Sequence, residues 1–131
     1  MFSDAFMFST ISVDDLDKAD QFYRDVLGLA TKRNAMVLLE VDAGHNTGFI
    51  AYPKPDHQPA AFTVQNIGVD DIDAAVEYLT SKGVKFKIYQ DGMSKTDDRG
   101  VSASPDGTMK IAWFKDPAGN IFSIIEGGHR G

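Results

Sequence analysis

Carboxylates and histidines are the side chains through which this chain could hold a metal ion or move a proton. Two acidic pairs stand out, Asp14-Asp15 and Asp70-Asp71, and they lie 56 residues apart in matching contexts. Paired carboxylates can serve as general acid and base or as metal ligands. Each pair, however, follows an apolar strand-like run and opens an amphipathic helical pattern, where an aspartate typically caps a helix. We therefore interpret both pairs as N-caps and not as catalytic groups.

The other residues that could carry chemistry are scattered. The sequence has no cysteine, which excludes a disulfide framework, a thiolate zinc site and a cysteine nucleophile. Its three histidines lie in a turn at His45, in a proline-rich linker at His57 and in the tail at His129. No nucleophile with a nearby base and no glycine-rich phosphate loop stands out. We expect no catalytic residue, no metal ligand and no cofactor.

A repeat indicates how the elements are organised. Residues 13–19 read VDDLDKA and residues 69–75 read VDDIDAA. A repeated strand-turn-helix unit in so short a chain predicts two similar halves packed together with a cleft between them. We predict a single α+β domain over 1–131 that contains two βαβββ modules, 6–52 and 60–126. Three prolines between 53 and 59 mark the linker that joins them.

Within the modules, the pattern predicts alternating strands and one helix each. In the first module, strands are expected at 6–12, 30–33, 36–41 and 47–52, with a helix that Gly28 ends. In the second, they are expected at 61–69, 84–89, 109–114 and 121–125, with a helix that Gly83 ends. Residues 90–108 read as a long loop, either a lid or simply mobile, and residues from 127 onward read as a frayed tail.

Composition excludes several classes of partner. The 131 residues carry a formal charge of −6 and contain no basic run, so nucleic acid and anionic membrane surfaces are poor partners. The opening MFSD lacks the charged and apolar regions of a signal peptide, and no apolar stretch is long enough to span a bilayer. We expect a cytoplasmic protein whose partner is a small molecule.

Three pieces of the sequence resemble the vicinal oxygen chelate superfamily, which includes glyoxalase I, extradiol dioxygenases and bleomycin-resistance proteins. They are VDDLDKA with the following FY and LGL at 22–29, the copy that begins at Val69, and FKDPAGN at 114–120. The resemblance implies the glyoxalase/bleomycin-resistance/dioxygenase fold, often as a homodimer. It also implies a metal site, with one ligand on the first strand and one on the last strand of each module.

The positions that would hold the metal carry unsuitable residues in this chain. The resemblance places one ligand five residues before the valine of each repeat, at Phe8 and Val64, and a carboxylate at Ser123. The fourth position falls within 49–52, whose register the sequence leaves open. Phenylalanine and valine cannot bind a metal, and serine is a poor ligand for these ions. Glu126, the carboxylate nearest to Ser123, is expected to point to the opposite face of its strand.

Strand alternation predicts which side chains line the cleft. The set is mainly apolar and aromatic with a few neutral hydrogen-bonding groups, as in small-molecule pockets. The predicted ligand-binding residues are Phe8, Thr10, Tyr52, Phe62, Val64, Asn66, Trp113 and Ser123. The same side chains could instead fill a collapsed cleft, and Trp113 could belong to the core.

Three functions remain open. The first is a metal-free protein, similar to the bleomycin-resistance branch, that binds or sequesters a hydrophobic or aromatic compound in the cleft. The second is a glyoxalase-like lyase or isomerase, or a ring-cleaving dioxygenase, with a divalent metal at a non-standard site. The third is a scaffold that binds a partner through an exposed sheet edge. We favour the first because every expected metal ligand is missing while the predicted cleft is rich in aromatic residues.

Overall fold

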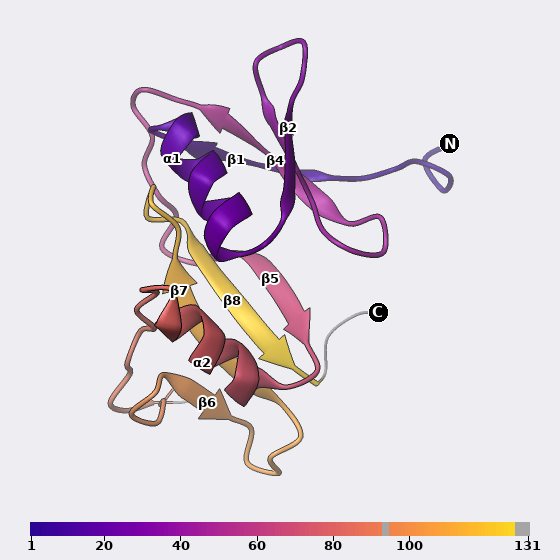
Figure 1. Cartoon of the computed structure of the whole chain (residues 1–131). Helices are drawn as coiled ribbons and strands as arrows, with labels where there is room; N and C mark the ends of the chain where they lie inside the picture. Colours follow the sequence, from indigo (N-terminus) through magenta and orange to yellow (C-terminus); the bar gives the residue numbers. More distant parts are fainter. Residues whose placement is uncertain (93–94, 128–131) are drawn as a thin grey trace. The chain divides into compact units, whose positions relative to one another are not determined.

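The computed structural model describes residues 1–92 and 95–127 (Figure 1). The chain divides into two compact units, Met1–Pro59 and Ala60–Gly131, and each predicted module falls within one of them. Each unit holds one four-stranded sheet and one helical segment, which confirms the predicted α+β class with two βαβββ modules. That the modules form a single domain around a shared cleft stays a prediction. His129 and the rest of the predicted tail after 127 lie outside the described residues.

The first unit follows the predicted βαβββ order. Its elements are β1 (Ser9–Val13), α1 (Leu16–Gln21), the π-helical turn η1 (Phe22–Val26), β2 (Ala30–Arg33), β3 (Leu39–Asp42) and β4 (Gly48–Pro53). The strand order is β1-β4-β3-β2, with β1 parallel to β4 and the other pairs antiparallel. The first and last strands of the module therefore lie side by side.

The first helix begins and ends as the sequence predicts. The carboxylate of Asp15 accepts a hydrogen bond from the backbone N of Lys18 at 3.1 Å, so Asp15 is the N-cap. At the other end, Leu27 N donates to Phe22 O at 3.2 Å, and this wider bond makes the last turn π-helical. Gly28 follows with φ +71°, a left-handed conformation that glycine adopts without steric cost.

One face of the first sheet packs against the helical segment and forms the core of this unit. Its fully buried members include Val13, Leu39 and Ala51, which alternate with more exposed residues along their strands. Tyr23 of η1 covers them, and its ring meets that of Phe49 edge-on at 5.3 Å. The opposite side of the sheet, termed here the first open face, carries the side chains of the residues that alternate with these buried ones along each strand.

The second unit repeats the same topology. Its elements are β5 (Thr63–Val69), α2 (Ile72–Ser81), β6 (Val101–Ala103), β7 (Lys110–Lys115) and β8 (Ile121–Glu126). The strand order is β5-β8-β7-β6, again with the first and last strands parallel. Helix α2 packs against β7 and β8 (Figure 1), and the core between them contains Phe114, Phe122 and Ile124.

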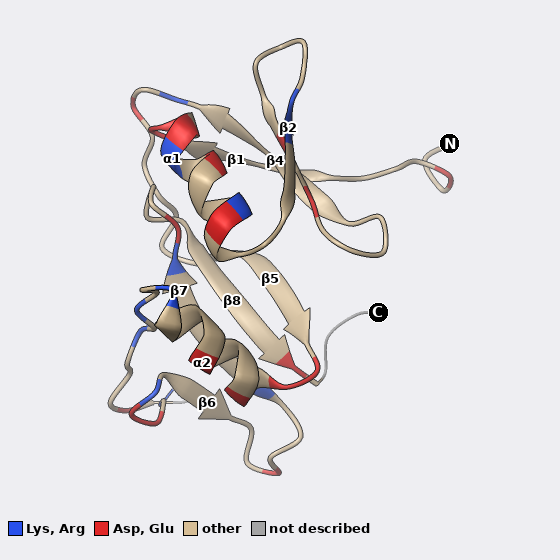
Figure 2. Cartoon of the chain, viewed as in Figure 1, with Lys and Arg blue, Asp and Glu red and all other residues tan. Residues whose placement is uncertain are grey.

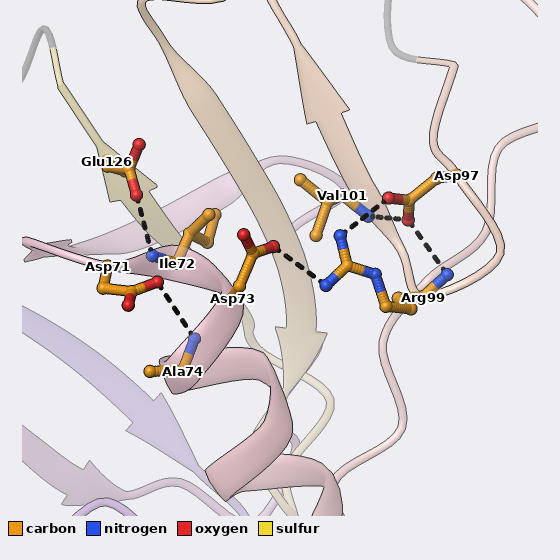
Figure 3. Close-up of polar contacts among 8 residues, drawn as sticks. All are labelled: Asp71, Ile72, Asp73, Ala74, Asp97, Arg99, Val101 and Glu126. Carbon is orange, nitrogen blue, oxygen red and sulfur yellow. Dashed lines mark hydrogen bonds and ion pairs between the residues drawn. The ribbon is translucent and has the colours of Figure 1, made fainter.

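Acidic residues gather at the start of both helices (Figure 2), where the helix dipole favours negative charge. In α2, Asp71 accepts a hydrogen bond from Ala74 N at 3.2 Å, which confirms the predicted cap. Glu126, at the end of β8, accepts a second one from Ile72 N at 2.9 Å (Figure 3). This contact places Glu126 on the helix side of the sheet, away from Ser123, as alternation predicts.

The segment between α2 and β7 differs from the prediction. Residues 84–89 form no strand, and the predicted loop 90–108 contains β6, which pairs with the edge of β7. In this segment Val84 is buried, and the ring of Phe86 packs on that of Phe114 at 5.8 Å. Lys87 N donates to Trp113 O of β7 at 2.9 Å. Further along, Tyr89 N donates to the side chain of Thr96 at 2.9 Å and not to a strand.

Side-chain bonds hold the described part of the 90–108 segment in place. Asp97 accepts hydrogen bonds from the backbone N atoms of Arg99 and Val101, both at 2.9 Å. The guanidinium of Arg99 bridges Asp97 at 3.1 Å and Asp73 of α2 at 2.8 Å (Figure 3). Burial alone would raise the pKa of Asp97, but these backbone and guanidinium contacts together hold it below its ordinary value.

Candidate ligand-binding site

The first unit contains a cavity of about 630 Å³ beside its open face. Its walls are the segment before β1, strand β3, the turn that leads into β4, and β4 itself. The volume lies within the range of small-molecule pockets in proteins. Phe8, one of the predicted ligand-binding residues, belongs to the wall, and Ile50 of β4 belongs to it as well.

Aromatic and sulfur-containing side chains form the apolar wall. Phe6, Met7 and Phe8 precede β1, and the rings of Phe6 and Phe8 lie 6.2 Å apart. Phe6 is 68% exposed and Phe8 60% exposed, although both border a cavity. Large apolar side chains that are exposed together mark a surface whose burial by a ligand or partner is favourable in free energy.

Two carboxylates, those of Glu40 and Asp42, also line the cavity. Strand β3 alternates between buried Leu39 and Val41 and the more exposed Glu40 and Asp42, so both acids lie on the open face. Glu40 is paired with Ile50 in the sheet, which brings a carboxylate next to an apolar part of the wall. The cavity therefore presents an aromatic surface and negative charge together.

A serine and a histidine meet on the same open face. Ser12 Oγ of β1 and His57 Nδ1 of the linker lie 2.6 Å apart, although 45 residues separate them in the sequence. Tyr52 of β4 is the sheet neighbour of Ser12, and Thr10 is the neighbour of Ile50. Both Thr10 and Tyr52 are predicted ligand-binding residues, and the structure places them on the open face but outside the cavity wall.

In the second unit, three predicted residues lie in one row across the sheet. Asn66 of β5 pairs with Ser123 of β8, which pairs with Trp113 of β7. The hydroxyl of fully buried Ser123 donates to Asn66 Oδ1 at 2.6 Å. Tyr89 packs edge-on against Trp113, with ring centroids 5.4 Å apart. The face of this sheet opposite α2 thus joins a polar pair to an aromatic one.

The start of β5 departs from the alternation that the sequence suggests. The pairing register with β8 shifts between Thr63 and Gln65, so Val64 is the extra residue of an irregular step. Thr63 pairs with Ile121, and Phe62 precedes the strand with 69% of its surface exposed. Counting every second residue from Asn66 back to Phe62 therefore does not describe one continuous face of β5.

A family model for the "Glyoxalase/Bleomycin resistance protein/Dioxygenase superfamily" matches residues 5–124 of the chain. The chain belongs to this superfamily. Among curated proteins, none matches the sequence. Solved structures, in contrast, match over nearly the whole chain.

One superfamily structure, from Sphaerobacter thermophilus, is 28% identical, covers 93% of this chain and 97% of its own, and has a TM-score of 0.72. TnmS3, an antibiotic binding protein from Streptomyces, is 22% identical over 95% of this chain and 98% of its own, with a TM-score of 0.68. Lactoylglutathione lyase from Agrobacterium tumefaciens is also 22% identical, over 94% and 93%, with a TM-score of 0.68. At 22% identity, the last two structures show only that the fold is similar.

The sheet register of this superfamily member settles which residue of 49–52 corresponds to Ser123. Thr10 and Asn66 are matched positions of the repeat, 56 residues apart. Asn66 pairs with Ser123 in the second sheet, and Thr10 pairs with Ile50 in the first. The four positions implied by the family resemblance are therefore Phe8, Ile50, Val64 and Ser123.

These four residues do not fit a metal ion. Three have apolar side chains, and the one hydroxyl, that of Ser123, already donates to Asn66. Across 1–92 and 95–127, no three His, Cys, Asp or Glu side chains gather as a metal ion would require. Glu126 cannot replace the missing carboxylate, because it bonds to the α2 backbone on the other side of the sheet.

Sequence reasoning missed part of the site. Glu40 and Asp42 carry a visible signal, since the stretch LEVD alternates apolar and acidic residues as a half-buried strand does. His57 carries none, because its partner Ser12 lies far away in the sequence. The sequence places Tyr89 at the end of an expected strand, and its contact with Trp113 depends on the folded structure.

Every helix in the described part of the chain is too short or too polar to cross a membrane.

Proposed function

We propose that this superfamily member is a metal-free protein that binds or sequesters a small hydrophobic or aromatic compound. The observation that carries the proposal is the cavity of about 630 Å³ in the first unit, with Phe8 and Ile50 in its wall. These are two of the four positions at which the family resemblance implies metal ligands. Apolar side chains at such positions leave no metal chemistry there and favour contact with an apolar ligand.

Two further features support binding of an aromatic compound. Phe6 and Phe8 offer neighbouring rings, and aromatic pairs contribute about 0.5–1.5 kcal/mol beyond the burial of area. In the second unit, Trp113 and the exposed side chain of Asn66 lie on one sheet face, which carries an aromatic ring and a polar amide. A protein of the same fold, TnmS3, is an antibiotic binding protein.

We also propose that the protein acts as a cytoplasmic homodimer. Support for the dimer comes from the family resemblance, and support for the cytoplasm comes from the lack of cysteine. Sedimentation equilibrium at micromolar concentration tests the dimer. A purely monomeric protein at that concentration would contradict it.

Thermal-shift screening against a library of apolar and aromatic compounds tests the binding function. A ligand present at about 100 times its Kd stabilises the folded protein by about 2.7 kcal/mol, which raises the melting temperature by several degrees. Phe8→Ala removes a ring from the cavity wall and should reduce that shift. Phe2→Ala is the matched control, because Phe2 is exposed and lies outside the wall.

Three results would contradict the proposal. The first is a library in which no compound stabilises the protein. The second is an equal loss of binding in the Phe8→Ala and Phe2→Ala variants, since only Phe8 borders the cavity. The third is a stoichiometric divalent metal in the purified protein, which would favour the enzymatic alternative.

A further inference from the structure

We infer that the ligand of the first-unit cavity is a cation: an aromatic or apolar body that carries a protonated amine. This inference rests on the proposed function and adds the charge of the ligand to it. The cavity wall combines the rings of Phe6 and Phe8 with the carboxylates of Glu40 and Asp42. A neutral hydrophobic ligand would contact the two rings, but it would remove water from the two carboxylates without replacing their hydrogen bonds.

The two carboxylates are available to a ligand. Among the described residues, no side-chain hydrogen bond or ion pair involves Glu40 or Asp42. Lys32 of β2 is the sheet partner of Glu40, yet it lies outside the cavity wall and forms no ion pair with Glu40. The acids of α1 differ in this respect, because Asp17 and Asp20 bind Arg33.

The placement of the acids suits an amine better than a metal ion. Glu40 and Asp42 point to the same side of β3 because they are two residues apart, and the described residues bring no third carboxylate or histidine to them. An ammonium group needs only one or two acceptors, and its charge strengthens each hydrogen bond. The ring faces of Phe6 and Phe8 add attraction for a cation near them.

Matched pairs of ligands test the inference. Each pair shares a ring system of one to four fused rings and differs only in an aminomethyl or a hydroxymethyl group, so shape is held constant and charge changes. Isothermal titration calorimetry at neutral pH and low salt should show about 10-fold tighter binding of the aminomethyl compound, equivalent to one charge-assisted contact. Added salt should reduce this preference, because exposed charges are screened.

Variants assign the preference to the two acids. The double variant Glu40→Gln, Asp42→Asn keeps the shape of both side chains and should bind the two members of a pair almost equally. Asp106→Asn removes one charge from an exposed turn of the second unit and should leave the preference intact. The salt dependence of the wild-type protein tests the inference even if the double variant does not fold.

The outcomes separate the two proposals. Equal binding of both members of every pair by the wild-type protein overturns the cationic ligand and leaves the hydrophobic binding function standing. An amine preference that survives in the folded double variant, or that does not respond to salt, also overturns it. Failure of every compound to bind, charged or neutral, contradicts the binding function itself.

Discussion

The turn between β7 and β8 provides a stringent test of how this fold is held together. Asp116 is only 4% exposed, and its carboxylate accepts hydrogen bonds within the turn. The donors are Ala118 N at 3.0 Å, Asn120 N at 2.8 Å and the side-chain amide of Asn120 at 3.1 Å. The substitution Asp116→Ala removes both carboxylate oxygens that accept these bonds and keeps the backbone of the turn.

The cost follows from the donors that the substitution leaves behind. Each buried donor without a partner costs about 1–3 kcal/mol. Asn120 is only 3% exposed, so its two donors cannot both reach water without movement of the turn. Allowing for such movement, we expect a loss of about 2–4 kcal/mol in the free energy of unfolding. For a chain of this length, that lowers the melting temperature by roughly 10 °C.

Urea unfolding followed by tryptophan fluorescence measures the effect. Trp113 is the chain's single tryptophan and lies on β7, which leads directly into the turn. With a typical urea dependence, the midpoint should fall by about 1–2 M. Asp106→Ala is the control, because Asp106 accepts bonds from Ser104 and Thr108 in an exposed turn of the same kind. A midpoint shift no larger than that of the control would refute the reasoning.

Two further predictions concern the segment before β7. The pKa of Asp97 is lowered in the folded protein, so its contribution to stability is present above the unfolded value near 3.8 and is lost as the pH falls through the folded value. Asp97→Asn should therefore destabilise the protein by less than about 1 kcal/mol at pH 7 and by less still near pH 3, in urea titrations at both pH values. Gly100→Ala should destabilise it more than Gly107→Ala: both glycines have positive φ, but a Cβ at Gly100 would lie 2.7 Å from that of Phe86, and one at Gly107 meets nothing within 4 Å. Equal melting temperatures of the two glycine variants would contradict the steric argument.

The sequence predicts the elements best where a local side chain determines the backbone. Asp15 and Asp71 each cap their helix through their own carboxylates, and Gly28 adopts the left-handed conformation that its position requires. Prediction fails at 84–89, because alternating apolar residues also occur in an irregular segment, in which Val84 is buried but Ile88 is 47% exposed. Val101–Ala103 pairs with Lys110 to Ala112 of β7, whereas the segment 84–89 meets the same strand through the bond from Lys87 N to Trp113 O at 2.9 Å.

The candidate site was predictable only in part. Counting back from the repeat leads to Phe8, which borders the cavity. The register of 49–52 depends on how β1 pairs with β4, which no local pattern determines. The irregular step at Val64 likewise depends on the pairing of two strands far apart in the sequence. The acids of β3 follow the alternation of LEVD, but they lie on a middle strand of the sheet, whereas the family resemblance points to the first and last strands of each module.

The positions at which the family resemblance implies metal ligands have physically different surroundings in the two halves. In the second half, Ser123 is buried and hydrogen-bonded to Asn66, so this position is closed by its own partner. In the first half, Phe8 remains 60% exposed beside a cavity. Covering the exposed part of a phenylalanine ring is worth about 25 cal/mol for each Å² of apolar surface removed from water, or on the order of 1–2 kcal/mol. That free energy is available to a ligand and to a second copy of the chain alike. If the binding of an aromatic amine depends on Glu40 and not on oligomeric state, this free energy stabilises the ligand complex and not a dimer.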